Sequence, residues 1–195
     1  MKRFSAAIAV CLLATGVSMA APSVTIGRVA DTYPYAALGG EFFLTPNSEL
    51  AALIGSSEPF PSFCLEMHEY VFEWQTYNAA VNDEAVAGGG RWPGEDPGSE
   101  GGDLISPETA YLYTEFRAGN LAGYEYTPGE DRMVWAEGLQ EAIWYFEYED
   151  GWTSLDALTP EAQTLVALAQ ESDWTDTGLV RVLNLSDRRG RAQLL

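Results

Sequence analysis

The chain of 195 residues has a single lysine, Lys2, and only two cysteines, Cys11 and Cys64. Residues 1–20 have the pattern of an export signal, because basic residues precede a short apolar run that small residues close. Removal of this segment leaves no lysine, and Cys64 as the one thiol. A single cysteine excludes an intramolecular disulfide, and the lack of lysine excludes Lys–Asn isopeptide crosslinks within the domain.

Basic residues are also few, with 10 Lys and Arg against 29 Asp and Glu, and the formal net charge is −19. This balance argues against nucleic acid as a partner, because that affinity depends on neutralising phosphates, and it favours a basic partner if charge selects one. The apolar run at residues 6–13 is too short to span a bilayer. We therefore predict one domain over residues 21–195, monomeric, secreted or at the cell surface, without a membrane span.

Turn-forming residues divide the chain into short strand-like and helix-like segments. β-Branched and aromatic residues bounded by Gly, Pro and Asn predict strands at residues 24–29, 40–44, 62–67, 79–86 and 179–185. A Ser or Thr followed by proline predicts helices over residues 106–118, 127–148 and 159–170. Strands followed by helices and then by a final strand indicate an α+β fold.

Cys64 and Gln140 are the residues most suggestive of chemistry. Cys64 lies in the predicted strand 62–67, and Gln140 lies in the second predicted helix. Ile143 and Trp144 follow Gln140 by three and four residues, so both side chains can overlie it. If the strand packs on this helix, the thiol can attack the carboxamide carbon and expel ammonia. On the residues alone, a buried inert cysteine and an unrelated glutamine are the simpler interpretation.

Two short motifs carry a resemblance to a known family. The sequence FCL at residues 63–65 and the sequence LQEAIW at residues 139–144 resemble the two signature motifs of bacterial thioester domains. Residues 103–116 and 144–149 are similar to exported bacterial proteins that contain such domains, some of which end in a PEP-type C-terminal sorting signal. The resemblance covers roughly residues 63–150.

The resemblance implies a β-sandwich or barrel-like body with a helical insertion of two or three helices. It implies an internal thioester between Cys64 and Gln140, with Trp144 and Ile143 as its apolar cover. The protein would then be adhesin-like rather than an enzyme, and would capture a protein or another amine-bearing surface ligand covalently. It would need no cofactor and no metal. Glu141 would be a polar neighbour of the bond.

Two alternatives from other classes stay open. The first is an extracellular matrix or carbohydrate-binding module without a thioester, which would use aromatic residues such as Trp92 and Trp152 as contact surfaces. The second is a cysteine-dependent hydrolase in which His68, the only histidine, activates Cys64. Four residues of strand span about 13 Å, which is too far for a Cys–His hydrogen bond. One cysteine and one histidine are also too few for a zinc site.

Overall fold

The computed structural model describes residues 20–28, 40–67, 71–85, 103–149 and 151–186, and the backbone of residues 192–194. Within these residues the main sheet is antiparallel and has six strands in the order β3-β2-β1-β4-β7-β8. The strands are β1 (Ser23–Arg28), β2 (Phe42–Pro46), β3 (Phe60–Ser62), β4 (Thr76–Asn82), β7 (Val182–Ser186) and β8 (Ala192–Leu194). A separate pair joins β5 (Glu84–Ala85) to β6 (Asp103–Leu104).

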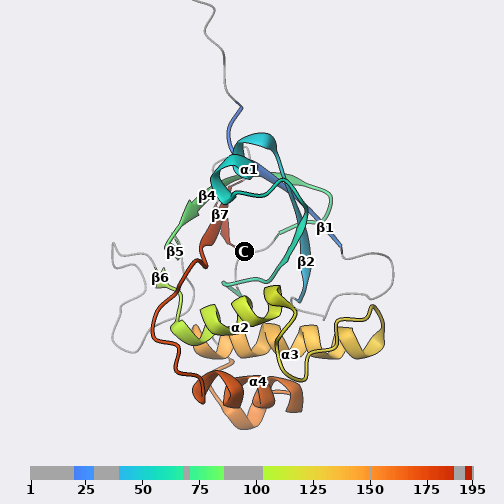
Figure 1. Ribbon diagram of the computed structural model, residues 1–195, viewed down its shortest axis with the longest axis vertical. Helices are drawn as coiled ribbons and strands as arrows, with labels where there is room; N and C mark the ends of the chain where they lie inside the picture. The colour runs from blue at the N-terminus through green and yellow to red at the C-terminus, as the bar shows by residue number, and fades with distance from the viewer. Residues whose placement is uncertain are drawn as a thin grey trace, which may run out of the picture.

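Three longer helices separate β6 from β7 along the chain. They are α2 (Pro107–Ala118), α3 (Glu130–Phe146) and α4 (Pro160–Gln170). A short 3-10 turn at Leu155–Ala157 precedes α4. Figure 1 shows the sheet curling like half a barrel above these helices, with α4 farthest from the sheet. The predicted α+β class, with a barrel-like body and a helical insertion, is confirmed.

The capping residues explain where the helices begin and end. Ser106 and Thr159 accept from the backbone N–H three residues on, and Gly119 ends α2 in the left-handed conformation. These predicted boundaries are therefore confirmed. The second helix begins at Glu130 rather than at Thr127, because the extended Gly129 precedes it without a side-chain cap.

The sequence prediction missed one helix, α1 (Ser48–Ile54), between β2 and β3. Its signals are present: the Asn47 side chain accepts from Leu50 N–H, Glu49 lies in the first turn, and Gly55 ends the helix. The helix buries a single side chain, Leu50, so its hydrophobic periodicity is weak.

α3 separates two hydrophobic cores. One core lies among the helices and includes Ile143, Phe63 and Leu65, and the other lies in the concave side of the sheet and includes Trp144 and Cys64. Residues on nearly all sides of the second half of α3 are therefore buried. This central position makes α3 the element on which the sheet and the other helices meet.

The predicted strand over residues 62–67 is wrong at Cys64. The strand β3 ends at Ser62, and Cys64 lies in the irregular segment that follows it. Pro61 lies within β3 and pairs with Phe43 of β2. Proline is tolerated there because β3 is an edge strand and needs no N–H on its free side. The predicted alternation survives, since Phe63 and Leu65 face the helical core and Cys64 faces the sheet core.

Candidate functional site

Gln140 and Cys64 are joined by a two-way hydrogen-bonded pairing. The side chain of Gln140 is buried on α3, and its Nε2 donates to the Cys64 carbonyl oxygen at 2.7 Å. Its Oε1 accepts from the Cys64 backbone N–H at 2.9 Å. A backbone N–H requires an acceptor and a carbonyl requires a donor, so this pairing fixes the orientation of the carboxamide. The two residues singled out from the sequence are therefore in direct contact.

A second backbone N–H reaches the same oxygen. Gly40 N–H donates to Gln140 Oε1 at 3.2 Å, and Gly40 has φ of 120°, in the region that favours glycine. Attack of a nucleophile on the carboxamide carbon moves negative charge onto Oε1. Two backbone donors in a buried site stabilise that charge, as in the oxyanion holes of acyl-transfer enzymes. The geometry thus favours chemistry at Cδ of Gln140.

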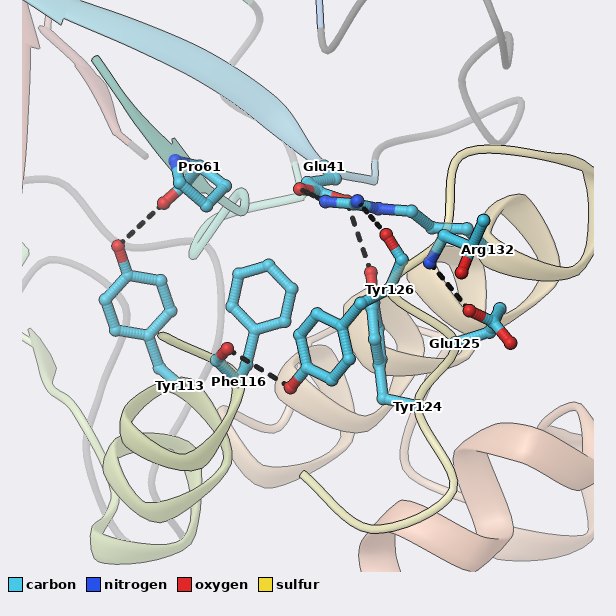
Figure 2. Close-up of polar contacts among 9 residues, drawn as sticks. Glu41, Pro61, Tyr113, Phe116, Tyr124, Glu125, Tyr126 and Arg132 are labelled. Carbon is cyan, nitrogen blue, oxygen red and sulfur yellow. Dashed lines mark hydrogen bonds and ion pairs between the residues drawn. The ribbon is translucent and has the colours of Figure 1, made fainter. Parts of the chain in front are cut away.

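A buried ion pair anchors the Gly40 segment to α3. Figure 2 shows Glu41 accepting from Arg132, at 3.0 Å from Nε and 2.6 Å from Nη2, and from the hydroxyl of Tyr124 at 3.2 Å. Arg132 also donates to the carbonyl oxygen of Tyr126. Charge-assisted bidentate pairs are short and directional. Because Glu41 adjoins Gly40, this pair holds the Gly40 N–H close to Gln140.

The Cys64 segment is anchored from the opposite side by α2. The Tyr113 hydroxyl donates to the Pro61 carbonyl oxygen at 2.9 Å, which ties α2 to the edge strand β3 (Figure 2). Phe63 packs edge-on against Phe116 of α2, with ring centroids 5.1 Å apart. Two residues that precede Cys64 are thus held by one helix.

The Cys64 thiol is buried and protonated at neutral pH. The residue is 6 % exposed, and burial raises the pKa of the Cys64 thiol to about 12. Cysteines that act as turnover nucleophiles have a lowered pKa, because the thiolate is the reactive species. The environment of Cys64 therefore differs from that of a cysteine hydrolase. His68, the proposed partner in such an enzyme, lies outside the described residues.

Trp144 and Ile143 are both buried, on different sides of the pair. Trp144 shares the sheet core with Cys64, and its ring lies 5.3 Å from that of Trp152. Ile143 and Cys64 both line a cavity of about 70 Å³, whereas Gln140 does not line it. A cavity of this size has room for water next to Cys64. Apolar packing therefore encloses Cys64 on the side of Trp144, whereas the cavity lies on the side of Ile143.

Glu141 contributes to the architecture at a different place. Its Oε2 accepts from both the backbone N–H and the hydroxyl of Thr159, each at 2.8 Å, so it joins α3 to the start of α4. Trp152 does not form an exposed platform, because it packs on Trp144 and donates to the Met67 sulfur at 3.0 Å. Trp92, the other aromatic proposed for carbohydrate binding, lies outside the described residues.

Sequence reasoning missed the residues that complete the site. Gly40, Glu41 and Arg132 carry no motif, and Glu41 and Arg132 are 91 positions apart. A glycine beside an acid, and an arginine in the first turn of a helix, are each common patterns. Only the folded chain brings these residues to Gln140.

Neither the family models, nor the curated proteins, nor the solved structures compared with this chain give a match. Across the described residues, no helix combines the length and the apolar character needed to cross a membrane. In the same part of the chain, no three His, Cys, Asp or Glu side chains converge as metal ligands. The class that the fold defines is an α+β protein with a half-barrel sheet and a three-helix insertion.

Proposed function

We propose that this protein forms an internal thioester between Cys64 and Gln140 and uses it to capture an amine-bearing partner covalently. The observation that carries the proposal is the pair of backbone N–H groups on Gln140 Oε1, one of which belongs to Cys64 itself. This arrangement ties the carboxamide to the backbone of Cys64, the residue that carries the only thiol of residues 21–195. The resemblance of residues 63–65 and 139–144 to thioester-domain motifs supports the same pairing.

The proposed thioester forms by transfer of the acyl group from nitrogen to sulfur. Sγ of Cys64 attacks Cδ of Gln140, and negative charge builds on Oε1 against the two N–H groups. The C–N bond then breaks, and the thiol proton leaves with the nitrogen as ammonia. In the capture step, a partner amine attacks Cδ, the C–S bond breaks, and a proton from the attacking nitrogen returns to sulfur. The products are an amide and the free Cys64 thiol.

Burial of the pair suits a stored bond. Water that reaches the acyl carbon hydrolyses a thioester, and the apolar packing of Cys64 with Trp144 limits its access from the sheet core. The raised pKa of the Cys64 thiol makes the thiolate a poor leaving group, which slows the reaction of the bond with any nucleophile. Such a bond is stored until a strong nucleophile such as an amine reaches it. Export of the protein as a secreted or surface-bound adhesin-like molecule belongs to the same proposal.

Intact-protein mass tests the proposal directly. The freshly purified protein should weigh one ammonia less than its sequence and should resist thiol alkylation while folded. Cys64→Ala and Gln140→Ala should each have the full mass of their own sequences. Methylamine should add to the parent at Gln140 and release a thiol that is alkylated after denaturation. A parent of full mass that takes up no methylamine contradicts the proposal.

A further inference from the structure

A groove on the surface runs alongside the Cys64 cavity. It encloses about 720 Å³ between α1, α2 and the segment that leads into β7. Pockets that bind small ligands or side chains commonly measure about 300–1,000 Å³. The groove and the cavity share the residues Phe60, Tyr113, Val180, Arg181 and Leu183. An extended group lying in the groove therefore has its end next to the cavity that Cys64 and Ile143 line.

The charge of the groove is opposite to that of the chain. Its lining includes two arginines, Arg117 and Arg181, and no Asp or Glu, in a chain with 29 acidic residues. Arg181 pairs with Asp83, and their Nε–Oδ1 distance is 2.9 Å. Among the described residues Arg117 makes no ion pair, and its guanidinium lies over the rings of Phe60 and Tyr113. Arg117 is thus a positive charge held in place by stacking and available to an anion.

The walls of the groove are apolar and partly exposed. Leu179 is 94 % exposed and Leu53 is 61 % exposed, and both line the groove. Apolar side chains that project into water beside a hollow are typical of contact sites. The groove therefore suits a ligand with an apolar stem and a negatively charged group.

We propose that this groove selects the amine that the thioester captures, and that the preferred amine is carried on an apolar stem with a carboxylate at its other end. The inference rests on the proposed thioester. The carboxylate pairs with Arg117, the stem lies along the apolar wall, and the amine enters the cavity beside Cys64. From there it attacks the acyl carbon that the thioester bonds to Sγ of Cys64, a residue that lines the cavity. The C–S bond breaks, and a proton passes from nitrogen to sulfur.

The test compares amines of similar basicity in a rate measurement by intact mass. 6-Aminohexanoate carries the carboxylate, hexylamine lacks it, and 1,5-diaminopentane replaces it with a second positive charge. The parent should react with 6-aminohexanoate faster than with the other two by about fivefold, which corresponds to about 1 kcal/mol. Within each protein the ratio of these rates is the readout, so a change in total activity does not affect it.

Variants assign the preference to the groove. Arg117→Gln should reduce the ratio to near one, and Arg117→Lys, which keeps the charge, should retain most of it. Leu179→Asp, at an exposed position, should also lower the ratio because it adds a negative charge to the groove. A parent that takes up methylamine but shows equal rates for the three longer amines overturns the groove and leaves the thioester standing. A preference unchanged in Arg117→Gln also overturns it, and a chain that reacts with no amine overturns both proposals.

Discussion

Gln140 makes three hydrogen bonds between its carboxamide and backbone atoms of two distant segments. Its oxygen accepts from the backbone N–H groups of Gly40 and Cys64, and its nitrogen donates to the carbonyl oxygen of Cys64. In an inert protein this pairing would only tie α3 to the segment after β3. In the proposed thioester chemistry, the same pairing would polarise the carbonyl and orient the nitrogen that leaves. Whether Gln140 has a structural or a chemical role therefore depends on the thiol of Cys64.

Trp144 allows a direct test of the apolar cover. Trp144→Ala opens the sheet core beside Cys64, so the thioester should hydrolyse faster on storage, as followed by the return of the full mass. Loss of a buried tryptophan also costs about 3–5 kcal/mol of stability. Trp144→Phe is the matched control, because it keeps an aromatic cover and removes an indole N–H that has no hydrogen-bond partner among the described residues. If a folded Trp144→Ala protein hydrolyses no faster than the parent, Trp144 is not a cover.

The Cys64 thiol predicts a loss of stability at high pH in protein that lacks the thioester. In Gln140→Ala the thiol is free, and burial holds its folded pKa at about 12 against an ordinary value of 9.0. The folded state then keeps its proton where the unfolded state loses it, so the stabilisation is complete below pH 9 and disappears as pH rises toward 12. Urea unfolding at a series of pH values measures the effect. The double variant Cys64→Ala/Gln140→Ala should not lose stability in this way between pH 9 and pH 12. If the free energy of unfolding changes with pH equally in the two proteins, the prediction is contradicted.

At the scale of elements, α3 and α4 can approach closely because Gly138 has no side chain. A Cβ at this position would lie 2.7 Å from Cβ of Glu161 and 3.0 Å from the Ala162 nitrogen. Both neighbours belong to the first turn of α4, which Glu141 caps through Thr159. The glycine therefore sets the distance at which the helix that carries Gln140 packs on α4.

Gly138→Ala should destabilise the protein by about 1–3 kcal/mol, the usual cost of overpacking. Helix propensity alone would favour alanine by up to about 1 kcal/mol, so the sign of the change isolates the steric effect. Chemical unfolding of the purified variant measures it. Gly27→Ala is the control, since a Cβ at Gly27 in β1 comes no closer than 3.5 Å to a neighbouring heavy atom, and it should not destabilise the protein. A Gly138→Ala protein as stable as the parent would show that α4 shifts without cost.

Local signals predicted most of the elements, and long-range contacts account for the rest. Ser106 and Thr159 marked helix starts, because a capping side chain acts on its own next turn. The sequence also indicated Cys64 and Gln140. The strand predicted at Cys64 is wrong because the three consecutive buried residues 63–65 pack into two different hydrophobic cores without pairing to another strand. Gly40 and Glu41 could not be predicted, because their roles depend on partners 100 and 91 positions away.

At the scale of the whole molecule, two electrostatic effects act at different ranges. The net charge of −19 attracts basic partners from a distance and should raise the rate of encounter. In the proposed capture, Arg117 acts only on the group that enters the groove. A lysine-rich partner is thus attracted by its overall charge. Among its lysines, the proposed groove favours an amine that has a carboxylate close to it.

Long-range attraction predicts that capture depends on salt. Adduct formation on a lysine-rich model protein should slow as ionic strength rises, because the screening length falls to about 10 Å at 0.1 M. Adducts already formed should survive both salt and denaturing gels, since the new bond is an amide. Methylamine uptake is the control and should vary little with salt. Equal rates of protein adduct formation at low and high salt would contradict the steering effect, and adducts in Gln140→Ala would contradict the covalent mechanism.

The 76-residue separation of Cys64 and Gln140 gives the proposed bond a second role as a crosslink. A covalent closure of that length restricts the unfolded chain, and the loop-entropy relation for disulfides puts its contribution at about 4 kcal/mol. Capture breaks the C–S bond, so the closure is lost at the moment the partner is attached. The protein that holds a partner would then melt at a lower temperature than the protein that waits for one. The amide would hold the partner permanently, while the domain that carries the amide would unfold more easily under mechanical force.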